Sequence, residues 1–127
     1  MARILVVEDS PIEAHQLVNL LVKHGHQVLT AASGDAGLAM ARDEAPDAIL
    51  MDVVLPGING FQATRQITRG ADTRHIPVIM ISSKKQEADR VWGERQGASA
   101  YLVKPVSDEQ LMSCINGILL RSVSAPS

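Results

Sequence analysis

The chain has 127 residues, 46% of them hydrophobic, which is enough to bury the core of one domain of ordinary size. Its formal net charge is -2, and it has no basic block of the kind that binds a phosphate backbone, which argues against nucleic-acid binding. Its single cysteine excludes an intramolecular disulfide, and no apolar run approaches the ~20 residues of a membrane span. We therefore expect a soluble, cytoplasmic protein.

Short apolar runs alternate with helical patterns along the whole chain. In chain order, the predicted elements are a strand at 4–7, a helix from Pro11 to the closing Gly25, a strand at 27–31, a helix at 34–44, a strand at 47–52, a helix at 61–68, a strand at 76–82, a helix at 87–96, a strand at 100–103 and a helix at 107–120. This alternation predicts one α/β domain over 1–121, with a doubly wound parallel sheet between two layers of helices, and a flexible tail over 122–127.

Two helix starts carry capping signals. Ser10 is the expected N-cap of the first helix, Pro11 is its first residue, and Glu13 is placed to complete a capping box with Ser10. Ser107 is expected to cap the start of the last helix. These helices follow the first and the fifth predicted strands.

Charged or hydroxyl-bearing side chains, which can bind ligands or take part in catalysis, lie at the ends of four of the five predicted strands. Glu8 and Asp9 come after the first strand, Asp52 ends the third, Ser82 ends the fourth, and Lys104 follows the fifth. The carboxyl ends of parallel strands lie on one edge of a sheet, where the ligand crevice forms at the point of strand-order reversal. We therefore expect Glu8 and Asp9 to face Asp52.

This set of side chains is typical of a phosphoryl-transfer site. Three neighbouring carboxylates repel one another unless a cation is present, and an all-oxygen set suits a hard divalent ion such as Mg²⁺. Lys104 adds an ammonium group and Ser82 a hydroxyl group, both of which can hold a phosphoryl group during transfer. A carboxylate can itself be the attacking nucleophile, which gives an aspartyl-phosphate.

Four stretches carry a family resemblance that covers the chain from about Arg3 to Leu120. The stretches "ILVVEDS", "DAILMDVVLPGINGFQATRQI", "IPVIMISS" and "GASAYLVKPV" together resemble the receiver domain of bacterial two-component response regulators. This resemblance implies a flavodoxin-like (βα)5 receiver fold with five parallel strands in the order 2-1-3-4-5. It also implies a signalling switch that catalyses only its own phosphorylation and dephosphorylation, and is otherwise not an enzyme.

The resemblance assigns roles to the acidic residues. Asp52 looks like the phosphoacceptor, which attacks the phosphohistidine of a sensor histidine kinase. Asp9 and Asp52 would bind Mg²⁺ directly, Glu8 would act through water, and Val54 would contribute its backbone carbonyl. Many relatives carry a polar side chain where this chain has Val54, a position that influences how fast the aspartyl-phosphate hydrolyses.

The resemblance also implies a conformational switch. Ser82 would close its hydroxyl on the phosphoryl group, Tyr101 falls on the switch aromatic, and Lys104 on the family's lysine, before a cis bond to Pro105. A downstream protein would then bind the face formed by the fourth helix, fifth strand and fifth helix, unless the protein serves only as a phosphate sink. Trp92 in the fourth helix is either an exposed binding residue or packed on a neighbouring helix.

Three further stretches of the sequence indicate a subfamily within the receiver domains. "KHGHQVLTA", "GFQATRQIT" and "VWGERQGA" are similar to the stand-alone regulators of the chemotaxis-like system that controls type IV pili and twitching motility. A flagellar-type chemotaxis regulator or another stand-alone receiver is the alternative within the family.

Two other classes of protein have a similar sheet topology. A Mg²⁺-dependent phosphatase with an aspartyl nucleophile would place a second Asp two residues after the first, where this chain has Val54. A flavodoxin-like cofactor carrier would need a hydroxyl-rich loop after the first strand and aromatic residues around the ring, and this chain has only three aromatic residues. Both classes fit the residues less well than a receiver domain.

Overall fold

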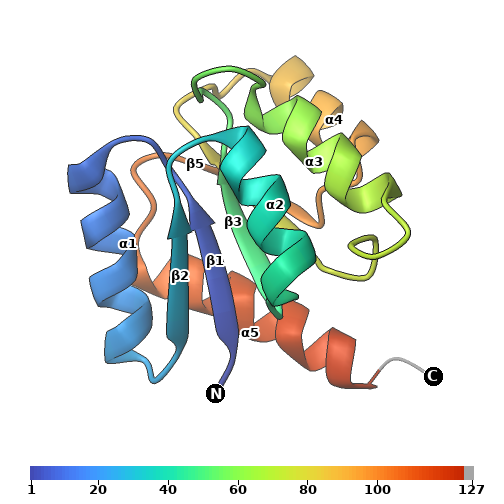
Figure 1. Ribbon diagram of the computed structural model, residues 1–127. Helices are drawn as coiled ribbons and strands as arrows, with labels where there is room; N and C mark the ends of the chain where they lie inside the picture. Colours follow the sequence, from blue (N-terminus) through green and yellow to red (C-terminus); the bar gives the residue numbers. More distant parts are fainter. Residues whose placement is uncertain (125–127) are drawn as a thin grey trace.

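The computed structural model describes residues 1–124, with side chains as far as residue 121, and contains ten elements in strict strand-helix alternation (Figure 1). In chain order these are β1 Arg3–Val7, α1 Pro11–Lys23, β2 Gln27–Ala31, α2 Gly34–Glu44, β3 Ala48–Asp52, α3 Gly60–Arg69, β4 Val78–Ser82, α4 Glu87–Arg95, β5 Ala100–Val103 and α5 Asp108–Ser124. The predicted element order is therefore confirmed throughout.

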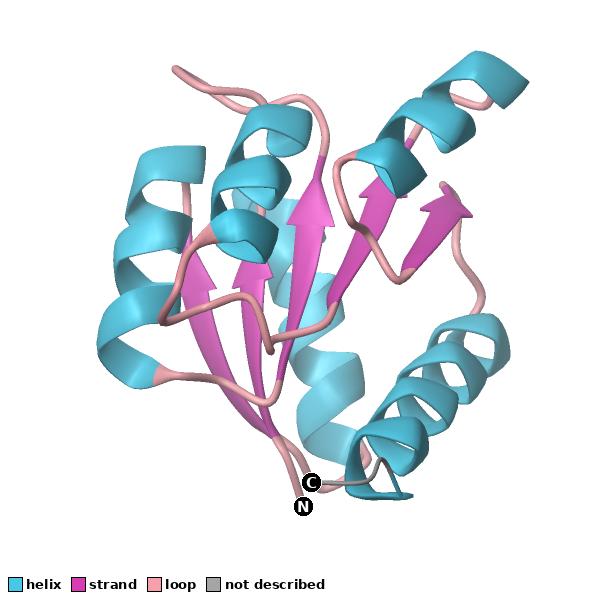
Figure 2. Cartoon of the chain, turned by 90° about the vertical axis from the view of Figure 1, so that its right-hand side faces the viewer, coloured by secondary structure: helices cyan, strands magenta, loops and turns pink. Residues whose placement is uncertain are grey.

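The five strands form one parallel sheet in the order β2-β1-β3-β4-β5, which confirms the predicted flavodoxin-like fold. Figure 2 shows all five strands pointing the same way, so their carboxyl ends lie along one edge. In the register of β1 with its two neighbours, Val7 lies beside Ala31 of β2 and beside Met51 of β3. The order reverses at β1 and β3, which places the expected crevice between these two strands.

Each face of the sheet carries its own hydrophobic core. On one face Leu38 of α2 and Ile67 of α3 pack in a cluster with β-strand residues, and α4 lies on the same face with Gly93 against Met80. On the other face Leu21 of α1 and Ile115 of α5 belong to the second cluster. Every residue of β3 and β4 is buried, which is why both strands read as continuous apolar runs.

Some element boundaries differ from those predicted, for local reasons. β3 begins at Ala48 because the Asp47 carboxylate accepts a hydrogen bond from the Arg3 backbone N–H at 2.8 Å. β4 begins at Val78, after Pro77, which has no N–H to donate to a neighbouring strand. α5 continues to Ser124, so the predicted tail is helical over 122–124, and 125–127 lie outside the described residues.

Helix caps show both an agreement and a correction. Ser107 caps α5 as predicted, since its Oγ accepts from the Gln110 N–H at 3.0 Å. The capping box predicted for α1 is only half formed: Ser10 Oγ accepts from the Glu13 N–H at 3.4 Å, but the Glu13 carboxylate binds elsewhere. The N–H of Ser10 donates instead to Glu8 Oε2 at 3.1 Å. α3 carries a complete capping box, between Asn59 and Gln62, that the sequence analysis missed.

Gly60 fixes the turn that follows Asp52. Its N–H donates to the carbonyl of Val53 at 2.8 Å, and a Cβ at this position would overlap the backbone carbonyl of Asp52. The first residue of α3 therefore packs directly on the end of β3, where only glycine leaves room for the backbone.

Two glycine substitutions should change stability in opposite directions. Gly60→Ala should lower the free energy of unfolding by about 1–3 kcal/mol or more, because the new Cβ forces the end of β3 to move. Gly117→Ala, at an exposed position inside α5 with no neighbouring atom in the way, should raise it by about 0.5–1 kcal/mol. Urea unfolding followed by circular dichroism measures both, and a Gly60→Ala protein as stable as the parent would contradict the packing described here.

Candidate functional site

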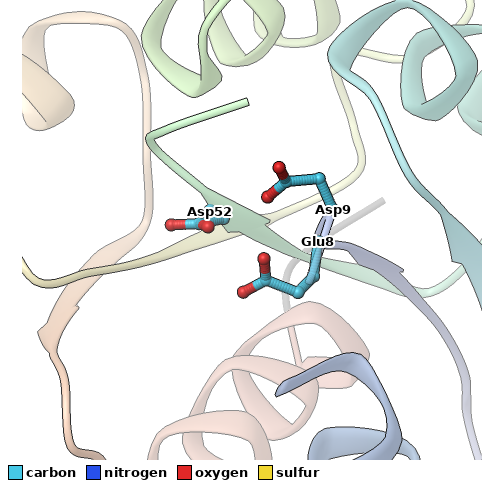
Figure 3. Close-up of side chains that lie close together, drawn as sticks. All are labelled: Glu8, Asp9 and Asp52. Carbon is cyan, nitrogen blue, oxygen red and sulfur yellow. The ribbon is translucent and has the colours of Figure 1, made fainter. Parts of the chain in front are cut away.

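Three carboxylates meet at the carboxyl edge of the sheet, as predicted. Glu8 and Asp9 follow β1, Asp52 ends the adjacent strand β3, and one carboxylate oxygen from each lies within 4.8 Å of the others (Figure 3). In Figure 3 the Asp9 and Glu8 side chains flank Asp52 from two sides. Among the described residues, this is the one group of three or more His, Cys, Asp or Glu side chains close enough to share a metal ion.

Two of these acids are buried, which makes their environment unusual. Glu8 is 4% exposed and Asp52 is 7% exposed, whereas Asp9 lies at the surface. Burial raises the pKa of Glu8, and the Asp52 charge adds to that effect, while hydrogen bonds from the Ser10 N–H and from Lys104 oppose it. The site thus holds carboxylates that need a positive charge nearby.

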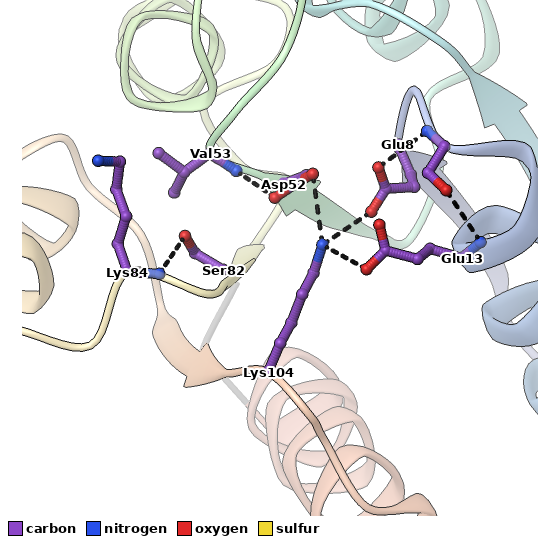
Figure 4. A network of polar contacts seen from close by, with 8 residues as sticks. Glu8, Glu13, Asp52, Val53, Ser82, Lys84 and Lys104 are labelled. Atoms are coloured by element: carbon purple, nitrogen blue, oxygen red, sulfur yellow. Dashed lines mark hydrogen bonds and ion pairs between the residues drawn. The ribbon is translucent and has the colours of Figure 1, made fainter.

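Lys104 supplies that charge from the loop between β5 and α5. Its Nζ lies 3.0 Å from Glu8 Oε1, 3.0 Å from Glu13 Oε1 and 3.4 Å from Asp52 Oδ2 (Figure 4). Burial alone would lower the pKa of Lys104, but its bonds to Glu8 and Glu13 and the charge of Asp52 hold that pKa above its usual value. Lys104 is therefore fully protonated and anchored among acids. The peptide bond between Lys104 and Pro105 is cis, as expected.

Glu13 is a site residue that the sequence analysis missed. Its side chain was expected to cap α1, whereas its carboxylate contacts Lys104. The available signal was its position, one helical turn beyond Asp9 at the start of a helix that faces the same edge.

Asp52 has one oxygen tied to the backbone and one directed to the lysine. Its Oδ1 accepts from the Val53 N–H at 2.8 Å, and its Oδ2 lies on the Lys104 side. Val54, two residues further on, is 59% exposed and places an apolar side chain at the surface beside the site. The site thus has no polar side chain at position 54 that could orient water.

Ser82 and Tyr101, the two predicted switch residues, both bond to the backbone of Lys84. The buried Ser82 Oγ accepts from the Lys84 N–H at 3.0 Å, and the Tyr101 hydroxyl donates to the Lys84 carbonyl at 2.7 Å. Burial raises the pKa of Tyr101, the Ser82 hydroxyl opposes this, and the charges of Asp89 and Asp52 reinforce it. The loop after β4 therefore links the strand end to the half-buried tyrosine of β5.

A cleft lies beside this centre, and a tryptophan is exposed on α4. The cleft, of about 560 Å³, lies between α1 and the start of α5, and both Glu13 and Lys104 line it beside apolar residues such as Leu17. Trp92 of α4 is 48% exposed, which decides the alternative left open by the sequence in favour of exposure.

The donor set fits a hard divalent cation. Glu8, Asp9 and Asp52 bring three carboxylates close enough to share an ion, Glu13 adds a fourth acid beside the lysine, and Lys104 provides the one ammonium that contacts these acids in the described structure. The centre therefore carries excess negative charge on oxygen atoms, which are the ligands that Mg²⁺ prefers. Within residues 1–124, no helix is long and apolar enough to cross a bilayer.

Comparisons with known proteins agree with this geometry. The model of the response regulator receiver domain matches residues 4–116. Protein PilH from Pseudomonas aeruginosa is 59% identical over 119 residues, which cover 94% of this chain and 98% of that protein. Some other matching relatives are longer, and this chain spans only 52% and 26% of two of them.

Solved structures show the same fold. A CheY-like receiver domain protein from Methanospirillum hungatei superposes with a TM-score of 0.92 at 25% identity, over 99% of both chains. The receiver domain of the sensor histidine kinase PA1611 from Pseudomonas aeruginosa has a magnesium ion coordinated in its active-site cleft; its TM-score is 0.87 at 30% identity, over 93% of this chain and 97% of that one. The chain therefore belongs to the response regulator receiver domain family.

Proposed function

We propose that this protein is a response regulator of a two-component phosphorelay, which accepts a phosphoryl group on Asp52 from a sensor histidine kinase. The observation that carries this proposal is the position of Asp52, a buried carboxylate grouped with two further acids and in contact with the Lys104 ammonium. An isolated aspartate at a strand end would need neither.

The reaction we propose is a direct transfer. A carboxylate oxygen of Asp52 attacks the phosphorus of a phosphohistidine, the new O–P bond forms, and the P–N electron pair returns to the imidazole. Lys104, 3.4 Å from Asp52 Oδ2, is placed to bind a phosphoryl oxygen as charge develops on it. Asp9, Asp52 and the Val54 carbonyl would hold Mg²⁺, with Glu8 acting through water, and the bound ion would neutralise the phosphoryl charge as a Lewis acid.

We propose that phosphorylation is read out through Ser82 and Tyr101. A phosphoryl group on Asp52 would attract the Ser82 hydroxyl, which now accepts from the Lys84 N–H. Movement of Lys84 would in turn release or reposition the Tyr101 hydroxyl that its carbonyl binds. The face formed by α4, β5 and α5, where Trp92 is exposed, is the proposed binding surface for a downstream protein.

The biological setting we propose is the chemotaxis-like system of type IV pili and twitching motility, in the cytoplasm. The stretches quoted above support it, together with 59% identity to Protein PilH over nearly the full length of both proteins. A flagellar-type chemotaxis regulator or another stand-alone receiver is the alternative, and phosphotransfer from the histidine kinases of the same cell distinguishes them. A role as a phosphate sink is the alternative to binding a downstream protein.

Phosphorylation should depend on Asp52 alone among the aspartates. Incubation with acetyl phosphate and Mg²⁺ should add one phosphoryl group, seen as a mass gain on the peptide that contains Asp52, and Asp52→Ala should abolish it. Asp43→Ala, an exposed position on α2 away from the site, is the matched control and should be phosphorylated normally. Persistent phosphorylation of the Asp52→Ala protein would contradict the assignment.

Mg²⁺ should stabilise the fold through the acidic cluster. A ligand that binds only the folded protein adds about 2.7 kcal/mol to the free energy of unfolding when its free concentration is about 100 times its dissociation constant. The thermal midpoint should therefore rise with Mg²⁺ in the parent and in Asp43→Asn, and should rise much less in Asp9→Asn, measured by calorimetry. An equal rise in Asp9→Asn would exclude Asp9 as a ligand.

The phosphorylated protein should be long-lived because Val54 cannot orient an attacking water. Val54→Asn places an amide beside Asp52 at an exposed position that tolerates polar atoms, and it should speed dephosphorylation several-fold. Loss of the phosphoprotein after removal of the phosphodonor measures this rate. Slower decay in Val54→Asn would refute the explanation.

A further inference from the structure

Glu13 binds the site lysine but stands apart from the acids that group around a cation position. Its Oε1 lies 3.0 Å from Lys104 Nζ, as close as the oxygen of Glu8. The group of acids able to share a metal ion consists of Glu8, Asp9 and Asp52, without Glu13. Its side chain is also 45% exposed, in contrast to the buried Glu8 and Asp52.

The start of α1 shows that this contact displaces a local one. Glu13 is the third residue of α1, from which a glutamate can bind back to the N–H of the N-cap residue and complete a capping box. Here the N–H of Ser10 donates to Glu8 instead, and the Glu13 carboxylate extends to Lys104 (Figure 4). The bond from the Ser10 N–H to Glu13 that would complete the capping box is therefore absent, and Glu13 forms an ion pair with Lys104 instead.

The number of donors on Lys104 limits what it can bind. An ammonium group has three N–H donors, and three carboxylate oxygens lie within 3.4 Å of Nζ. A phosphoryl oxygen that approaches Lys104 therefore competes with these carboxylates for the same three donors. Once Asp52 carries the phosphoryl group its own carboxylate charge is gone, so Glu8 and Glu13 are the remaining competitors for Lys104. Glu13 leaves at the lower cost, because its half-exposed carboxylate is readily hydrated, whereas release of the buried Glu8 would leave an unpaired charge.

We infer that Glu13 is a positioning residue that holds Lys104 in a resting place until a phosphoryl oxygen takes it over. The inference rests on the proposed function, and it gives Glu13 two effects of opposite sign. By competing for Lys104, Glu13 weakens binding of a phosphoryl group on Asp52. By sharing the Lys104 ammonium with Glu8 and Asp52, it offsets part of the positive charge that opposes Mg²⁺ at their oxygens and so strengthens binding of the cation.

Glu13→Gln separates these two effects. The variant keeps the size of the side chain and removes its charge, so Mg²⁺ should bind about two- to fivefold more weakly, and beryllium fluoride, a phosphoryl analogue, about two- to fivefold more tightly at saturating Mg²⁺. Isothermal titration calorimetry measures both. Glu44→Gln is the matched control. It removes one charge at the last residue of α2 and breaks one ion pair, with Arg3, so it should change neither affinity.

A double-mutant cycle with Lys104→Met tests whether Lys104 carries the effect. If Glu13 acts by holding Lys104, Glu13→Gln should no longer weaken Mg²⁺ binding once Lys104 is replaced. If its effect on Mg²⁺ persists unchanged in the Lys104→Met protein, Glu13 acts only through its general negative field, and the inference is overturned. Glu13→Asp, which keeps the charge but shortens the side chain, should shift both affinities in the same directions as Glu13→Gln and serves if that variant folds poorly.

The remaining outcomes are also decisive. Two affinities that shift in the same direction, or that both stay at the parent values in a folded Glu13→Gln protein, overturn the role of Glu13 and leave the proposed function intact. Failure of the parent protein itself to bind beryllium fluoride in the presence of Mg²⁺ overturns the proposed function, and with it the inference.

Discussion

The hydrogen bonding of the sheet holds acidic side chains next to one another, and the repulsion between their like charges is the constraint on which the rest of the site depends. Val7 of β1 lies beside Met51 of β3, so the residues that follow, Glu8 and Asp52, must emerge side by side. Neither can move away without breaking the pairing of the two central strands. Lys104 relieves this repulsion only in part, because one ammonium faces several carboxylates. The folding energy of the sheet thereby maintains an acidic centre that favours a divalent cation.

Most of the architecture could be predicted because local and tertiary preferences agree. The strands at Gln27–Ala31 and Ala100–Val103 and the helix at Gly34–Glu44 have the bounds expected from the apolar pattern. The differences arise where a side chain or a proline decides the boundary, as with the Asp47 carboxylate on the Arg3 N–H. A pattern of apolar and polar residues does not contain that information, since the partner lies far away in the sequence.

The same distinction applies to the site. Topology alone brings Asp9 and Asp52 to one edge, so their proximity follows once the sheet is known to be parallel. Glu13 had two possible partners, the local N–H of Ser10 and the distant Lys104, and only the three-dimensional structure shows which of them it binds. The shared contact of Ser82 and Tyr101 with Lys84 depends in the same way on the path of a loop, which residue type does not determine.

That shared contact uses only the amide and carbonyl of Lys84, one as donor to Ser82 and the other as acceptor from Tyr101. Almost every amino acid offers the same two groups, so a main-chain relay of this kind tolerates side-chain variation at the linking position. A change of the exposed Lys84 side chain can thus alter the surface charge of this loop without breaking the link between the end of β4 and Tyr101.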